Sequence, residues 1–144
     1  MRRILQEVHQ RLEEFIEQRE DLMLLASCTE NDTAIFLKVL RDLEQSSDVD
    51  VFLLFGHSFH EPRAFVDEAI KQLQEQHKLA SQALVEAGKS PMAPFPLELQ
   101  SPSRPALERL HDAISFARTL FPFEGGHRLI WAMVPEQIAD LRRV

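Results

Sequence analysis

The sequence predicts an α/β fold, a small three-layer domain in which helices flank a three-stranded parallel sheet. Three short apolar runs lack period-two alternation, as in strands that are covered on both faces. Between them, apolar residues recur every three or four positions, as on one face of a helix. Strands separated by helices pair in parallel through right-handed crossovers. The predicted strands, with approximate bounds, are residues 22–28, 49–55 and 127–134.

The chain opens with an amphipathic helix, because residues 2–19 place apolar side chains on one helical face and charged ones on the other. The first predicted strand, 22–28, is apolar throughout. A short polar turn, 29–32, follows and is rich in residues that cap helices. We expect the next helix to run from about Thr33 to Gln45.

The second strand, 49–55, is rich in β-branched and aromatic residues and is closed by Gly56. A long helix is expected from Pro62 to Ala87, because proline suits the first helical turn and Gly88 suits its end.

Residues 89–105 hold five of the eight prolines and are expected to form an extended crossing segment. A further helix is predicted at about 105–120, and Pro135 opens a last short one after the third strand. The 144 residues fit a single domain. Because the chain stops soon after a strand, we expect either the front part of a larger α/β domain or a small domain completed by oligomerisation.

Composition narrows the class of protein. Lys and Arg number 16 and Asp and Glu number 23, a net charge of −7 that argues against nucleic-acid binding. No apolar run approaches the ~18 residues of a membrane span. A single cysteine excludes an intrachain disulfide. The charged N-terminal residues lack a signal-peptide core, so we expect a cytoplasmic protein.

The order helix, strand, turn, helix and strand over roughly residues 1–60 resembles the opening of AAA-type P-loop ATPase domains. The turn SCTENDT stands where those domains carry G-x-x-x-x-G-K-[ST], and the next helix reads AIFLKVLRDLEQ. Both phosphate-loop glycines and the lysine are missing. The third strand ends Met133-Val134-Pro135-Glu136, which is not a Walker B motif. The resemblance implies a degenerate or truncated member without nucleotide hydrolysis.

The turn is also a candidate anion site. Thr29, Asn31 and Thr33 offer hydrogen-bond donors at a helix N-terminus, which attracts anions. Glu30 and Asp32 would repel phosphate, and two acids already complement the helix dipole. We therefore favour structural capping over phosphate binding.

The stretch after the second strand holds His57, His60 and Glu61, side chains that could help to ligate a metal. On a turn their geometry is not fixed as it is on a helix, so a structural role is favoured and no cofactor is expected. Cys28 and His57 could also form a nucleophile–base pair. A lone cysteine that ends an apolar strand is more often a small buried hydrophobe.

The function that the sequence favours is a non-catalytic interaction or regulatory module that presents helical apolar faces to a protein partner or to a second copy. The alternatives are a nucleotide- or phosphate-binding ATPase fragment that uses the turn 29–33, and a small metal or Cys-His enzyme. The candidate interaction residues are Leu5, Leu12, Ile16, His77, Ala80 and Leu84.

Overall fold

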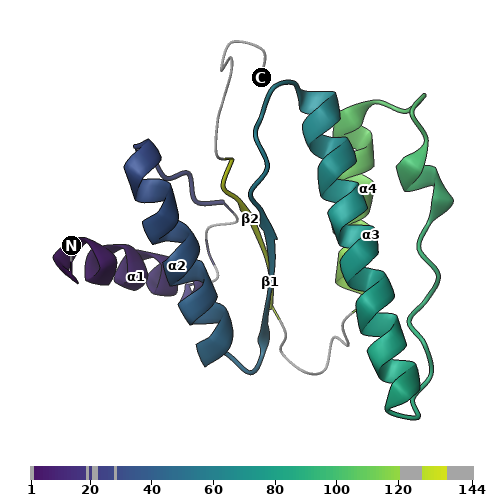
Figure 1. Cartoon of the computed structure of the whole chain (residues 1–144), viewed down its shortest axis with the longest axis horizontal. Helices are drawn as coiled ribbons and strands as arrows, with labels where there is room; N and C mark the ends of the chain where they lie inside the picture. The colour runs from purple at the N-terminus through teal and green to yellow at the C-terminus, as the bar shows by residue number, and fades with distance from the viewer. Residues whose placement is uncertain (1, 19, 21–22, 28, 121–127, 136–144) are drawn as a thin grey trace.

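The computed structural model describes residues 2–18, 20, 23–27, 29–120 and 128–135. Within them the chain alternates between helices and two short strands (Figure 1). The elements are α1 (Arg2–Glu17), α2 (Glu30–Ser46), β1 (Asp50–Phe55), α3 (Pro62–Glu86), the 3-10 helix η1 (Leu97–Gln100), α4 (Ala106–Thr119) and β2 (Arg128–Met133).

The elements form three layers, as the sequence predicts. Figure 1 shows α1 and α2 on one side of the sheet and α3 and α4 on the other. The two strands pair in parallel, with Asp50 opposite Arg128 and Phe55 opposite Met133. Because successive side chains alternate between faces, the sheet serves two apolar clusters. Leu53, Phe55, Leu129 and Trp131 pack toward α3 and α4, while Phe52, Leu54, Ile130 and Ala132 pack toward α1 and α2.

The sheet has two strands among the described residues, so the expectation of a third strand at 22–28 is wrong over the part that is described. Residues 23–27 lie outside regular structure, with Met23 80% and Leu25 89% exposed. The run is apolar but contains no β-branched or aromatic side chain, unlike the strand at Asp50–Phe55. Apolar content alone did not distinguish a strand here.

The helices lie close to the expected positions. α2 begins at Glu30 rather than at Thr33, because Thr29 already acts as its N-cap. α3 opens on Pro62, and Gly88 just beyond its end takes a φ of +74°, which favours glycine. The helix expected after Pro135 lies outside the described residues. No described helix combines the length and the apolar character that crossing a bilayer requires.

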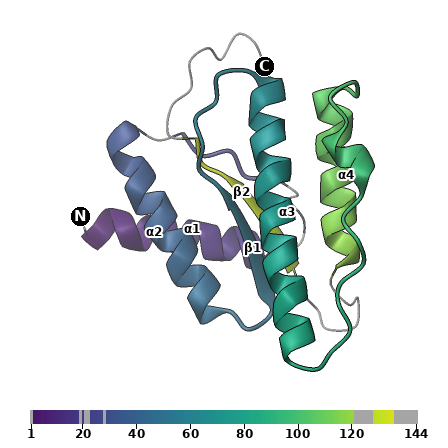
Figure 2. The ribbon, with the colours of Figure 1, turned by 45° about the vertical axis from the view of Figure 1, so that its right-hand side comes forward.

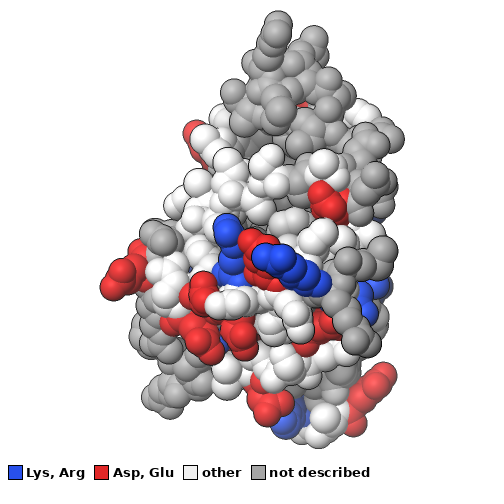
Figure 3. All heavy atoms as spheres, turned by 90° about the vertical axis from the view of Figure 1, so that its left-hand side faces the viewer, with Lys and Arg blue, Asp and Glu red and all other residues white. Residues whose placement is uncertain are grey.

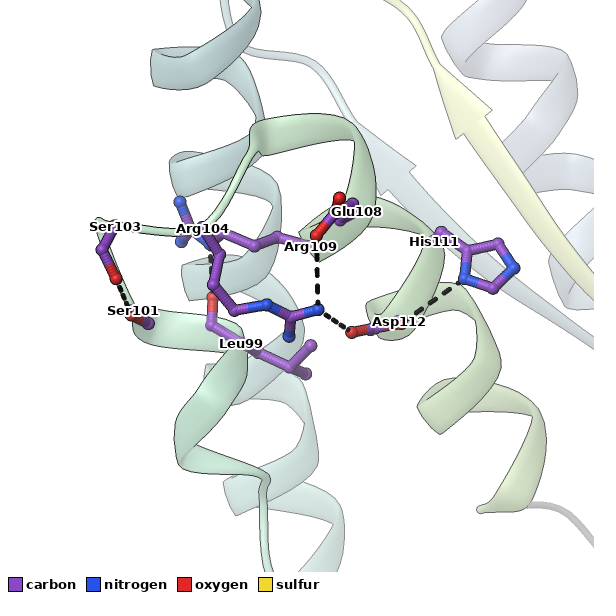
Figure 4. Close-up of polar contacts among 8 residues, drawn as sticks. All are labelled: Leu99, Ser101, Ser103, Arg104, Glu108, Arg109, His111 and Asp112. Atoms are coloured by element: carbon purple, nitrogen blue, oxygen red, sulfur yellow. Dashed lines mark hydrogen bonds and ion pairs between the residues drawn. The ribbon is translucent and has the colours of Figure 1, made fainter.

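The proline-rich segment 89–105 returns alongside α3 and α4 (Figure 2). Within it, η1 buries Leu99, which is 2% exposed. The buried Arg109 of α4 holds this segment: its Nε donates to the Leu99 carbonyl at 2.7 Å, and its Nη1 pairs with Asp67 of α3. Arg104 adds an ion pair to Asp112 at 2.7 Å (Figure 4). The segment 89–105 is therefore bonded to the layer of α3 and α4, which covers one face of the sheet.

A second set of polar contacts fastens the amino ends of both strands. Arg128 donates from Nε and Nη2 to the two oxygens of Asp50, the latter at 2.8 Å, and from Nη1 to the Ile16 carbonyl at 2.6 Å. Ser47 donates to Asp50 at 2.8 Å. Burial raises the pKa of Asp50, but the bonds from Arg128 and Ser47 and the guanidinium charge outweigh this, so the pKa lies below its ordinary value.

Candidate functional site

The turn before α2 is occupied by its own capping residues. Asp32 Oδ2 accepts the Thr29 hydroxyl at 2.6 Å and the Thr29 N–H at 3.2 Å. These two bonds, the side-chain one first, hold the pKa of Asp32 below its ordinary value. Thr33 is partly buried, and the side chain of Asn31 lies outside what the structure describes. The Thr29 donors are thus directed at a carboxylate of the chain itself, as in a capping box.

The histidines after β1 are not assembled into a ligand set. His57 bonds through Nε2 to the Phe65 carbonyl at 3.0 Å, and its ring lies against the Phe65 ring at 4.5 Å. His60 and Glu61 are exposed, and Glu61 is the N-cap of α3. In the described part of the chain, no three His, Cys, Asp or Glu side chains are grouped to hold a metal. Cys28 lies outside the described residues, so its distance to His57 is not described.

The apolar stripe of α1 packs within the chain. Ile16 is buried, and Leu5 and Leu12 are partly buried against a cluster formed with α2 and β1. The outward side of α1 and α2 carries interspersed acidic and basic side chains (Figure 3). Glu7 and Arg11 pair there at 3.3 Å. This helix face is therefore used for the core, and its opposite face is polar.

The distal half of α3 is partly covered by the crossing segment. His77 bonds to the Ala93 carbonyl at 2.7 Å and contacts the rings of Phe95 and Phe116, each 5.7 Å away. Leu84 is partly buried and Ala80 is exposed. Of the six candidate interaction residues, only Ala80 is exposed.

The sequence predicts a small sheet with exposed edges, but it does not reveal which edge is capped and which is open. The Arg128 N–H donates to the Val49 carbonyl and the Val134 N–H to the Phe55 carbonyl. In a strand, successive backbone groups point to alternate sides. The residues of β2 whose N–H and C=O point away from β1 are therefore Leu129, Trp131 and Met133.

The outer edge of β1 is partly capped by side chains. By the same alternation, Asp50, Phe52 and Leu54 point their backbone groups away from β2, and bonds from within the described chain reach two of these residues. Gln72 of α3 donates its Nε2 to the Leu54 carbonyl, and the Asp50 N–H donates to Ser47 Oγ at 3.0 Å. This edge is therefore partly satisfied from within the chain.

The outer edge of β2 has no such caps. Across residues 2–18, 20, 23–27, 29–120 and 128–135, no hydrogen bond reaches the backbone of Leu129, Trp131 or Met133 from the side away from β1. Trp131 stacks on Phe55 with ring centroids 5.1 Å apart, and its buried Nε1 has no partner in this same part of the chain. Figures 1 and 2 both show Met23–Ser27 running on the β2 side of the sheet.

This edge is a candidate contact surface for another strand, because a row of unpaired N–H and C=O groups is a template for pairing. The exposed apolar segment Met23–Leu25 lies on the same side. No local sequence signal identifies the open edge. Which edge is open depends on which strands are neighbours, and the capping of the other edge depends on Gln72, which is 18 residues from Leu54. No family model, no curated protein and no solved structure matches this chain.

Proposed function

We propose that the chain is a non-catalytic interaction or regulatory module that joins a protein chain at the outer edge of β2. The observation that carries this proposal is the open edge formed by Leu129, Trp131 and Met133, in contrast to a β1 edge that the chain partly caps itself. Adding a strand to an open sheet edge is a recurrent way in which proteins recognise one another. In this mode of recognition, the affinity comes from backbone hydrogen bonds between the added strand and the sheet.

The burial of the two strands supports the same proposal. Three residues of β1 are buried, whereas every residue of β2 keeps some exposure. Within the register, Phe55 is 0% exposed and its neighbour Met133 is 40% exposed. Strands of parallel sheets are normally covered on both faces. β2 therefore has surface left for a further neighbour.

The partner that fits the edge is a second copy of the chain. The outward residues are spaced evenly about Trp131, so two β2 strands can pair antiparallel about a two-fold axis at that residue. Trp131 then faces its own copy, and Leu129 faces Met133. Each such pair exchanges both its N–H and its C=O bonds. The contact is isologous, like most homodimer interfaces.

The likeness to the front part of AAA-type P-loop domains belongs to this proposal, as a degenerate P-loop-like fold. Of the order that carries this likeness, α1, α2 and β1 are present, while residues 23–27 do not form the strand expected before the turn. A phosphate-binding fragment that uses the turn 29–33 is the less favoured alternative. There Asp32 already takes the Thr29 hydroxyl and N–H, so phosphate would have to displace a carboxylate.

Sedimentation of the full chain over a wide concentration range tests the proposal. The wild type should form a dimer as concentration rises. Met133→Pro should reduce dimerisation strongly, because it removes an outward N–H without removing a bond to β1. Leu107→Asp, a change at a 78% exposed position of α4, should behave like the wild type. Identical sedimentation of the wild type and Met133→Pro would contradict the proposal.

A further inference from the structure

We infer that Met23–Ser27 is an intrinsic competitor for the β2 edge: it docks there as a parallel strand and leaves when a partner chain binds. The regulatory part of this inference rests on the proposed function. The docking itself rests on the connections between the elements, on the length and composition of the segment, and on its place in the structure.

The connections place the segment on the β2 side. The chain passes from β1 to β2 through α3 and α4, over one face of the sheet, and from Met23–Ser27 to β1 through α2, over the opposite face. Right-handed crossovers over opposite faces move in opposite directions across a sheet. The crossover through α3 and α4 runs from β1 to β2. The crossover through α2 therefore runs the opposite way across the sheet and reaches β1 from the β2 side. With β2 already beside β1, the position left for the segment is the outer edge of β2.

The length and the backbone of the segment suit that position. Five residues in an extended conformation span roughly 16 Å, close to the length of the six-residue β2. Thr29, the N-cap of α2, has φ −82° and ψ 164°, so the chain enters the helix from an extended conformation. Both views of the ribbon show the segment on the β2 side (Figures 1 and 2).

The composition of the segment also suits docking. Met23, Leu24 and Leu25 are apolar and at least 46% exposed, and the segment holds no charge and no proline. Each of its residues can therefore donate and accept in a ladder. Exposed apolar side chains that are contiguous mark a surface that is covered in another state.

The consequence is a competition for one row of backbone groups. While Met23–Ser27 is docked, the outward groups of Leu129, Trp131 and Met133 are paired within the chain. When it is undocked, they are available to a second copy. Changes that weaken docking should therefore strengthen self-association, which is the signature of an autoinhibitory segment.

Amide hydrogen exchange of the full chain, followed by NMR at a concentration where the protein is monomeric, tests the docking. Leu25→Asp places a charge in the docked strand, and Leu107→Asp is the matched control at a similarly exposed leucine. The Trp131 and Met133 amides should exchange about tenfold or more faster in Leu25→Asp than in the wild type, the change expected from losing the burial of one leucine. Leu107→Asp should leave them unchanged.

The same variants test the competition by sedimentation. Leu25→Asp should tighten dimerisation by about tenfold, because the released edge is available more of the time. Met23→Asp should act in the same direction. The amides of the β1 strand should stay as protected as in the wild type, which shows that the fold is intact.

The two proposals fail in different ways. If Leu25→Asp accelerates exchange at Trp131 and Met133 but no variant dimerises, the docking stands and the interaction proposal is overturned. If the wild type dimerises through Met133 but Leu25→Asp changes neither exchange nor dimerisation, the competitor is overturned and the interaction proposal stands. Trp131 is the only tryptophan, so its fluorescence reports on this edge in either case.

Discussion

The two outer edges of this sheet differ in how the chain treats their backbone groups. On β1, Gln72 and Ser47 bond to the outward groups of Leu54 and Asp50. On β2, in the part of the chain that the structure describes, nothing bonds to the outward groups. Proteins commonly blunt exposed edges to prevent unwanted pairing. This difference between the two edges is the ground for our proposal that the β2 edge receives a further strand.

The largest loss of unfolding free energy should come from breaking the ion pair that joins the two strands. Arg128→Met removes the partner of the Asp50 carboxylate, which has a side chain only 6% exposed. Leaving a buried charge without its partner costs roughly 3 kcal/mol of unfolding free energy. Urea denaturation measures it. Arg11→Met, which breaks the exposed pair with Glu7, should cost about 0.5 kcal/mol or less. Equal losses in the two variants would show that the strand ends are not fastened by this pair.

A smaller effect should come from uncapping the β1 edge. Gln72→Leu leaves the Leu54 carbonyl without its donor, and a part-buried acceptor without a partner costs about 2 kcal/mol. Thermal or urea unfolding measures the loss, with Gln82→Leu at an exposed position of the same helix as the control. If the two substitutions have the same effect, the cap does not protect this edge and the contrast with β2 disappears.

Thr29→Ala should cost about 1 kcal/mol, because it removes the N-cap side chain of α2. It also loosens the junction between α2 and the segment that we place at the β2 edge. Circular dichroism during urea unfolding measures the loss. Ser103→Ala, on the crossing segment, is a control for removing an exposed hydroxyl bonded to a neighbouring side chain. A stability equal to that of the control would contradict the capping role.

The smallest expected change is in the acid dependence of stability. The pKa of Asp50 lies below its ordinary value in the folded chain. Its contribution is therefore fully present above the unfolded pKa of about 4 and is lost as the pH falls through the lower folded pKa. The unfolding free energy measured between about pH 2 and 6 should fall less steeply in Arg128→Met than in the wild type. Parallel slopes would contradict this.

Helical periodicity and strand composition were together enough to predict most of the fold. The β-branched and aromatic run at 49–55 became β1, and the three-to-four spacing at 62–87 became α3. The run at 22–28 misled, because leucine and methionine are apolar without favouring extended backbone. An apolar run does not by itself predict a strand, because pairing depends on neighbours that come later in the chain.

The candidate site was harder to predict. From the sequence, Thr29–Asp32 and His57 were candidate site residues because their polar side chains could bind an anion or a metal. In the structure, Thr29, Asp32 and His57 form hydrogen bonds within the chain. The edges of the sheet are set by backbone alternation and by the long-range contact from Gln72 to Leu54. Local composition indicates neither the alternation nor this contact, so the open and capped edges are identified only from the three-dimensional structure.

The contacts of Arg128 also govern the order in which the chain can fold. This residue bonds to Asp50 across 78 positions and to Ile16 across 112. Pairing over such separations is slow compared with helix formation. On the ribosome, the residues between the strands take on the order of ten seconds to synthesise. During that time Phe52 and Phe55 have no β2 beside them, and the newly made helices are their only cover. Transiently exposed apolar surface and unpaired strand edges of this kind are prone to misassembly.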